Sequence, residues 1–181
     1  MANEYEIPFY DINDRIDTFD KHMSRIVTQE FREWLIENGF FSQAASTKFH
    51  GAYAGGLFDH SLRVMLNLKL LTGRLDLEWQ RPESPFIIGM FHDLCKIDQY
   101  YKDGDTFRWR KTEIPGHGDK SVILLSRNMK MTREEVLCIR FHMGAFTDQK
   151  EWSLFTDAIH EFPNTLYTHV ADMMASHIEM T

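Results

Sequence analysis

His92 and Asp93 stand side by side inside residues 84–97, a stretch that is otherwise mostly apolar. Burying an aspartate costs several kilocalories per mole unless the carboxylate is paired or coordinates a cation. Asp172 raises the same problem, because it lies among small apolar residues such as Ala171 and Ala175. A fold that buries these segments must bring further charged or metal-binding side chains to them, and this requirement constrains the fold more than any other feature.

Apolar residues recur at helical spacing through most of the chain. The pattern predicts helices over residues 28–39, 57–73, 84–97, 118–129, 132–144, 151–162 and 164–180. The expected boundary signals are Gly39, Gly73 and Gly144 as stops, Ser84 with Pro85, Asp119 and Asn164 as starts, a Thr132–Glu135 capping box, and a break at Pro163.

Residues 99–114 depart from the helical pattern. Aromatic, β-branched and charged residues surround an Asp103-Gly104 pair there, which predicts a short β-hairpin that turns near Gly104. We therefore expect an all-α bundle of about six to eight helices with one small hairpin. The 181 residues suit a single domain, 1–181, in which residues 1–45 form helices that pack on the core and close one side of a pocket.

Charge and composition narrow the classes of partner. The formal net charge of -7 disfavours long nucleic acid and anionic membrane as main partners, although it leaves room for a local basic pocket. Residues 1–15 lack the basic and apolar pattern of a secretory signal, and we expect no membrane span and a cytoplasmic location. Cys95 and Cys138 lie in apolar segments and are expected to be buried thiols, with a disulfide as the less favoured reading.

Four histidines are distributed one to a predicted helix or its edge. They are His60, His92, His117 and His142. A helical bundle can bring one side chain from each of several helices to a single point, which is how such folds build metal sites. Imidazoles and carboxylates together suit divalent ions such as Mn, Fe, Ni, Mg or Zn, so the sequence predicts one or two such ions.

The arrangement resembles the H…HD…D signature of the HD-domain superfamily of metal-dependent phosphohydrolases, with His60, His92-Asp93 and Asp172 in the signature positions. Five segments are similar to that family in the expected order, most closely to the HD domains of bacterial 3′–5′ exoribonucleases: HGAYAGGLFDHSLRV, FHDLCKI, GHGDKSV, FHMGAF and HVADMMA. The resemblance covers residues 50–178 and implies an HD-type helical bundle there.

The resemblance implies a set of metal ligands. A first ion would be held by His60, His92, Asp93 and Asp172, and a second by His117 and His142, with Asp93 able to bridge the two. Asp93 and Lys96 are the expected catalytic residues, because Lys96 occupies the lysine position of the family's HD-x-x-K stretch. The alternative for Lys96 is a structural salt bridge, for example with Asp59.

The implied activity is hydrolysis of a phosphomonoester or phosphodiester of a nucleotide or short oligonucleotide by metal-activated water. The 181 residues are expected to hold neither the exoribonucleases' extra nucleic-acid-binding domain nor the GYP loop of cyclic-dinucleotide phosphodiesterases, so we expect neither group's substrate to transfer directly. Two alternatives stay open: a di-iron oxygenase of a small polyol or phosphonate on the same fold, and a non-catalytic nucleotide-binding module. The oligomeric state is not indicated.

Further residues are candidates for contact with substrate. Lys96, His50, His169 and Lys120 are expected to bind substrate, although His169 and His50 are equally open to structural roles. The remaining histidines, His22, His160 and His177, are expected at the surface or in packing. In the hairpin, Arg108, Arg110 and Lys111 alternate with Phe107 and Trp109, a pattern that fits either an ordinary two-faced strand or a platform for a base and a phosphate.

Overall fold

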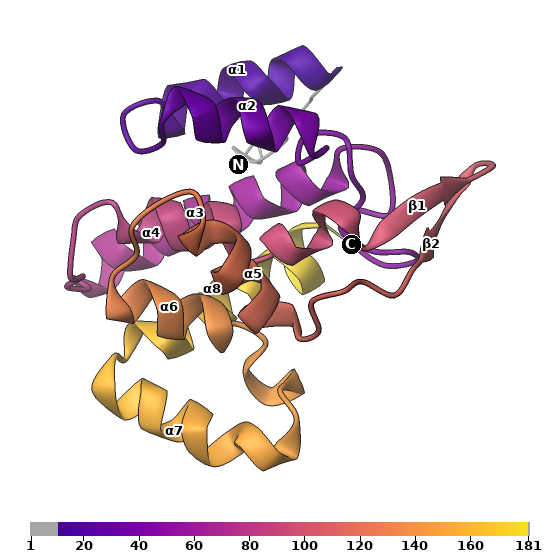
Figure 1. Cartoon of the computed structure of the whole chain (residues 1–181). Coiled ribbons are helices and arrows are strands. Elements are labelled where there is room, and N and C mark those ends of the chain that lie inside the picture. Colours follow the sequence, from indigo (N-terminus) through magenta and orange to yellow (C-terminus); the bar gives the residue numbers. More distant parts are fainter. Residues whose placement is uncertain (1–10, 181) are drawn as a thin grey trace.

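The computed structural model describes residues 11–180, and within them it has eight α-helices and one two-stranded hairpin. This confirms the expected all-α bundle with a small β-hairpin (Figure 1). The α-helices are α1 Ile12–Met23, α2 Gln29–Glu37, α3 Gly56–Leu75, α4 Ser84–Phe91, α5 His117–Ser126, α6 Arg133–Arg140, α7 Trp152–Glu161 and α8 Asn164–Met174. The strands are β1 Tyr100–Asp103 and β2 Thr106–Trp109, and four short helical turns are η1 Leu94–Asp98, η2 Gly144–Phe146, η3 Gln149–Glu151 and η4 Ala175–Glu179.

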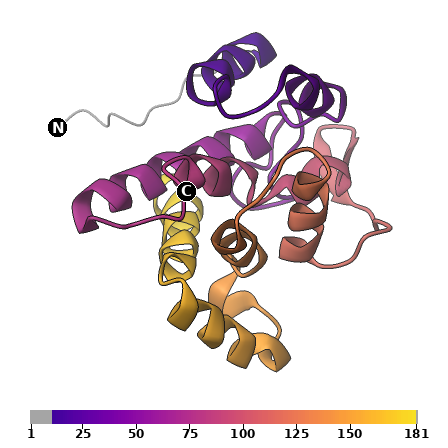
Figure 2. The ribbon, with the colours of Figure 1, turned by 60° about the vertical axis from the view of Figure 1, so that its left-hand side comes forward.

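The helices are arranged around α3, which packs against both α4 and α8. Helices α1 and α2 lie on one side of this centre and α7 lies on the opposite side, in both views (Figures 1 and 2). The hairpin projects from the edge of the bundle, with Tyr100 paired antiparallel to Trp109. The histidines and aspartates of the central helices are thereby brought to the middle of the molecule.

The N-terminal helices pack on the core through aromatic rings. Phe19 of α1 stands edge-on to Phe41 at a ring-centroid distance of 5.3 Å, and Phe31 of α2 lies 5.2 Å from Phe91. Such pairs add to the stabilisation that comes from burying their area. Because Phe91 directly precedes His92, these helices help to fix the end of α4.

Several boundary signals act where they were expected. The Thr132–Glu135 capping box is present at the start of α6. Gly39 follows α2 in the left-handed region, with a φ of 78°, where glycine is favoured. The hairpin turns at Gly104, whose φ is 59°.

Four predicted boundaries are wrong by short distances. Gly73 lies within α3, which runs to Leu75 and ends where Asp76 adopts the left-handed conformation that aspartate tolerates. Helix α6 ends at Arg140, four residues before Gly144. At the other ends, Gly116 rather than Asp119 precedes α5, and Ser84 is the first residue of α4 after Glu83.

The predicted helix over residues 84–97 is interrupted in its middle. Helix α4 ends at Phe91, His92 is its C-cap, and Asp93 leaves the helical region with φ −102° and ψ 19° before η1 begins. The backbone N–H of Cys95 donates to the Ser121 hydroxyl oxygen of α5 at 3.0 Å, which gives the chain a partner after the break. His92 and Asp93 are therefore not held about 100° apart, as neighbours on a continuous helix would be.

Gly89 lets α3 and α4 come into close contact. A Cβ placed on it would lie 2.3 Å from Met65 Cα, whereas a Cβ on the exposed helical Gly73 meets nothing within 4 Å. We expect Gly89→Ala to lower the free energy of unfolding by about 1–3 kcal/mol, because the helices must separate. The matched change Gly73→Ala is expected to raise it by up to about 1 kcal/mol. Chemical denaturation of both variants measures the contrast, and equal effects would contradict this packing.

The two cysteines are free and buried. Burial raises the pKa of Cys95 and of Cys138 to about 12. Both thiols therefore stay protonated near neutral pH and are poor nucleophiles. Separately, none of the helices in residues 11–180 has the length and apolar character needed to cross a bilayer.

Candidate metal centre

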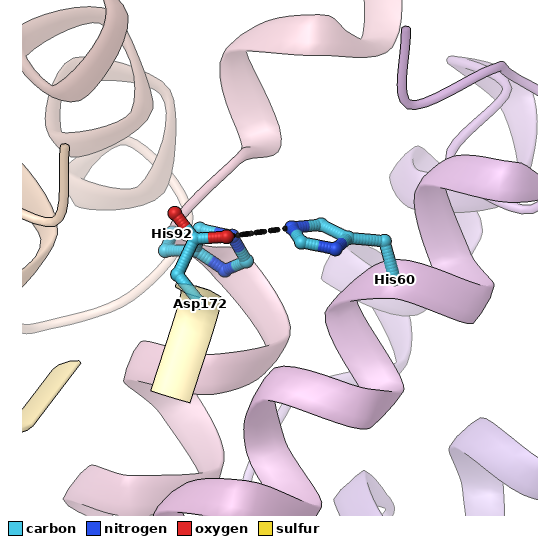
Figure 3. A group of neighbouring side chains, drawn as sticks. All are labelled: His60, His92 and Asp172. Atoms are coloured by element: carbon cyan, nitrogen blue, oxygen red, sulfur yellow. Dashed lines mark hydrogen bonds and ion pairs between the residues drawn. The ribbon is translucent and has the colours of Figure 1, made fainter. Parts of the chain in front are cut away.

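Four side chains from three parts of the fold converge at the centre of the bundle. His60 Nε2 on α3 lies 3.2 Å from Asp172 Oδ1 on α8 and 3.1 Å from His92 Nε2 at the end of α4. Asp93 Oδ2 lies 3.5 Å from both imidazole nitrogens. Figure 3 shows the carboxylate of Asp172 facing the ring of His60 directly, each projecting from a different helix, with the ring of His92 on the Asp172 side in this view. These donor atoms form the first group of the metal centre.

The second oxygen of Asp93 faces a different pair of histidines. Asp93 Oδ1 lies 2.9 Å from His117 Nε2 at the start of α5 and 3.5 Å from His142 Nε2 just after α6. The two oxygens of one carboxylate thus serve two groups of nitrogen donors. The break in the helix at Asp93 allows this arrangement, because it places the carboxylate of Asp93 between the two groups of histidines.

The spacing of the donor atoms fits a shared divalent ion. Ligands about 2.1 Å from one ion lie about 3.0–3.4 Å from each other at octahedral or tetrahedral angles. The separations in both groups, 2.9–3.5 Å, fall close to that range. Moreover, Asp93 Oδ1 and His142 Nε2 are buried and make no well-oriented hydrogen bond among the described residues, although Asp93 Oδ1 lies 2.9 Å from His117 Nε2. The centre therefore fits a bound metal: His60, His92 and Asp172, or alternatively His92, Asp93 and His142, could hold an ion, because the one free lone pair of His92, on Nε2, can bind a single ion.

A third combination, Asp93, Cys95 and His117, also brings three donor types together. Metal binding requires the thiolate form of cysteine. Burial, however, raises the pKa of Cys95 to about 12, so its thiol is protonated. This makes Cys95 a weaker ligand than the neighbouring imidazoles.

Two of the histidines are oriented by main-chain carbonyls. His92 Nδ1 lies 2.9 Å from the carbonyl oxygen of Gly89, and His142 Nδ1 lies 2.7 Å from that of Ile139. Each Nδ1–H donates to its carbonyl, which leaves the Nε2 lone pair directed into the centre. In the neutral ring this bond selects the tautomer whose Nε2 can bind metal. Burial lowers the pKa of His92, which favours the neutral ring, whereas burial of His142 is outweighed by its contact with Asp93 and its pKa is raised.

The charges of the centre suit a bound cation. Burial alone would raise the pKa of Asp93, but Lys96, His92 and His117 hold that pKa well below its usual range. Burial likewise opposes ionisation of Asp172, and its contact with His60 more than offsets it, so the pKa of Asp172 is also lowered. His60 has a raised pKa, because Asp172 and Asp93 outweigh its burial. A proton on His60 competes with an ion, so metal affinity should fall as the pH falls.

Lys96 is bound to the aspartate that joins the two groups. Its ammonium lies 2.6 Å from Asp93 Oδ2. Although burial opposes it, Asp93 raises the pKa of Lys96, so the side chain stays charged. The suggested alternative partner, Asp59, instead pairs with Arg15 Nε at 2.8 Å and accepts a hydrogen bond from Tyr53.

A cavity of about 800 Å³ opens onto the centre. Asp93, Lys96, His117 and Asp172 lie on its lining, and so does His50. The ring centroid of His50 is 4.9 Å from that of His60. Burial lowers the pKa of His50 to about 4, so it is neutral near pH 7. The volume of this cavity is typical of small-molecule sites.

Two predicted substrate residues lie outside this lining. His169 Nδ1 donates to the main-chain carbonyl oxygen of His142 at 2.9 Å. This bond helps to hold the backbone of His142, a candidate ligand, in place. Lys120 is buried, pairs with Asp98, and lines a smaller adjoining cavity of about 340 Å³. His117 lines both cavities.

The basic residues of the hairpin are also outside the main cavity. Arg108 pairs with Asp103 of the facing strand, and Arg110 Nε donates to the carbonyl oxygen of Asp98 at 2.7 Å. Trp109 and Lys111 line the smaller cavity. The N-terminal helices do not reach the main cavity either: of described residues up to 45, Ala45 alone lines it.

The structure adds cavity residues that the sequence did not single out. They are Ser46, Phe49, Tyr100, Met143, Phe146, Met173, Ser176, His177 and Met180. Helical spacing from Asp172 signals Ser176, four residues later, and Met180, four further on. His177 was expected at the surface or in packing, and it is exposed but also lines the cavity. His22 on α1 and His160 on α7 do not line the cavity.

Replacing His142 by alanine is expected to lower the metal content by about one ion per chain, since it removes an oriented donor from the second group only. Elemental analysis after loading with Mn²⁺ measures the content. His160→Ala, an exposed histidine on α7, is the matched control and should leave it unchanged. Unchanged stoichiometry in His142→Ala would reduce the centre to one ion.

Comparisons of the chain with protein-family models, with curated proteins and with solved structures found no match.

Proposed function

We propose that this protein is a metal-dependent phosphohydrolase that cleaves a phosphomonoester or phosphodiester bond of a small, nucleotide-like substrate. One observation carries the proposal. Asp93 directs its two oxygens to two groups of histidines and lies beside Lys96 on the lining of a cavity that a small ligand can enter. The resemblance of the His60, His92-Asp93 and Asp172 segments to HD-domain phosphohydrolases points to the same chemistry.

Divalent ions bound by these residues would act as Lewis acids toward the phosphoryl group and make water a stronger nucleophile near neutral pH. Four imidazoles among the six donors favour Mn, Fe, Ni or Zn over Mg. Burial lowers the pKa of His92, so that ring needs no proton removed before it binds, and its Nδ1–H bond to Gly89 leaves Nε2 free. The low pKa of Asp93 and of Asp172 keeps both carboxylates ready as ligands.

The chain's own residues divide the remaining tasks. Lys96 is charged and faces the cavity, so it can neutralise a phosphoryl oxygen as negative charge shifts during reaction. Asp93 fixes the ammonium of Lys96 at 2.6 Å, which orients it before substrate arrives. His50 and His117 are further polar residues on the lining. Two buried free thiols fit a reducing compartment, and we propose the cytoplasm.

Metal analysis of the purified protein, joined to a substrate screen, tests this function. Phosphomonoesters, phosphodiesters and nucleotides are assayed with Mn²⁺, Mg²⁺, Fe²⁺, Ni²⁺ and Zn²⁺. We expect hydrolysis that requires a divalent ion and disappears with chelator. A metal-loaded protein that hydrolyses none of these esters would contradict the proposal.

A second candidate is a di-iron oxygenase of a small polyol or phosphonate. The observation that favours it is the donor set itself, four histidines and two aspartates around a shared carboxylate. Iron content, colour and oxygen consumption distinguish it from a hydrolase. A nucleotide-binding module without catalysis would show binding in the same screen and no turnover.

A further inference from the structure

We propose that the cavity selects esters with a single phosphoryl group on a flat apolar body, and that Phe49 and Phe146 hold this body at the mouth. The inference rests on the proposed hydrolase function and specifies its substrate class. It is carried by the distribution of charge and of aromatic side chains over the cavity.

The cavity has few cations for a polyphosphate. Among the described residues Lys96 is the one lysine or arginine on the lining, and its ammonium already contacts Asp93. Chains of phosphates are usually held by several arginine or lysine side chains. In the adjoining cavity, Lys120 is engaged with Asp98. Metal ions at the centre and Lys96 together suit one phosphoryl group, and a second or third would meet no free cation on this lining.

The rest of the lining is largely apolar. It includes Ala45, Tyr100, Met143, Met173 and Met180 along with the two phenylalanines. Methionine side chains adapt to the shape of what they contact. The apolar lining shares one cavity with Asp93 and Lys96, so a molecule whose phosphoryl group reaches the centre has its body against these side chains.

The two phenylalanines are unusually exposed for their size. Phe49 is 80% exposed and Phe146 is 64% exposed, although both line the cavity. Exposed aromatic faces bind flat rings by stacking, with little dependence on which ring is present. Because they come from separate segments, one before α3 and the other in η2, they can contact a body from different directions.

The nearby hydroxyls are engaged in fixing the lining. The Ser46 hydroxyl oxygen accepts from the backbone N–H of Phe49 at 2.9 Å, which holds that segment in place. The Ser176 hydroxyl donates to the carbonyl oxygen of Asp172 at 2.8 Å. Because the Ser176 hydroxyl already donates within the chain and the Ser46 hydroxyl oxygen already accepts, we expect selection to depend on flatness and apolar surface more than on the hydrogen-bonding edge of a particular base.

The first test compares two esters with the same kind of leaving group, benzyl phosphate and ethyl phosphate, on the metal-loaded protein. We expect kcat/KM to favour benzyl phosphate by about tenfold or more. Phe49→Ala and Phe146→Ala should each lower kcat/KM for benzyl phosphate about 5- to 50-fold and leave ethyl phosphate within about twofold. Tyr101→Ala, an exposed aromatic outside the lining, is the matched control and should change neither.

A binding measurement separates failure of this inference from failure of the proposed function. Benzylphosphonate and methylphosphonate, which resist hydrolysis, are titrated calorimetrically into the Mn²⁺-loaded protein. Tighter binding of the benzyl compound, lost in Phe49→Ala or Phe146→Ala, supports the aromatic mouth even if no ester is turned over. Equal binding of the two phosphonates overturns it, as does faster hydrolysis of a nucleoside triphosphate than of the monophosphate.

Discussion

Asp93→Asn is expected to lower kcat/KM for every phosphate ester by about a thousandfold or more, without unfolding the protein. The asparagine side chain has the same shape but no negative charge, and one of its two ends becomes an N–H donor that repels a cation. Since Asp93 Oδ1 and Oδ2 face different groups of histidines, both groups lose affinity together. Kinetics and elemental analysis on the same preparation measure the two losses.

The control for this variant is Asp20→Asn. Asp20 also accepts two charge-assisted hydrogen bonds, from Arg32 at 2.7 Å each, but it lies on α1 away from the centre. Its replacement should reduce stability slightly and leave metal content and turnover unchanged. If Asp93→Asn retained full activity, the carboxylate would not be part of the reaction and the mechanism would be wrong.

Removing the metal is expected to lower the midpoint of thermal unfolding by about 5–10 °C. Ions bound by the folded centre and not by the unfolded chain would stabilise the native state. Without them, the buried carboxylates of Asp93 and Asp172 depend on Lys96 and His60 for compensation. Thermal melts followed by circular dichroism, before and after EDTA and again after Mn²⁺ is restored, measure the shift.

The Asp93→Asn protein serves as the comparison in this experiment. Its melting temperature should respond little to either EDTA or Mn²⁺, because both groups of ligands are impaired. A native protein whose melting temperature is indifferent to chelator and to all added divalent ions would show that the six side chains form a polar network and no metal site.

Helical periodicity and capping chemistry were sufficient to predict the architecture. The Thr132–Glu135 box and the turn at Gly104 depend on interactions between residues close in sequence, so they can be read locally. The break at Asp93 could not be predicted in this way. The backbone N–H of Cys95, just after the break, bonds to Ser121 of α5, which lies 26 residues further along the chain. The close contact at Gly89 similarly depends on Met65 of another helix.

The candidate ligands could be chosen from the sequence because they are unusual: ionisable side chains in segments that are otherwise buried. What the sequence did not contain is which oxygen of Asp93 faces which histidine, since that follows from the break in the helix. The cavity wall was missed for a different reason. Phe49 lies in an irregular segment and Phe146 in the three-residue turn η2, and both are too short for periodicity to mark the side that faces a ligand.

The carbonyls of Gly89 and Ile139 belong to the last turns of α4 and α6, where main-chain acceptors have no ordinary partner four residues later in the helix, although that of Ile139 also accepts from the N–H of Phe141. Each is used to align the histidine three positions later. No side-chain substitution can delete such an orienting group. The alignment of these two ligands depends on where each helix stops, so inserting or deleting one residue at either helix end would alter the centre while every ligand stayed in the sequence.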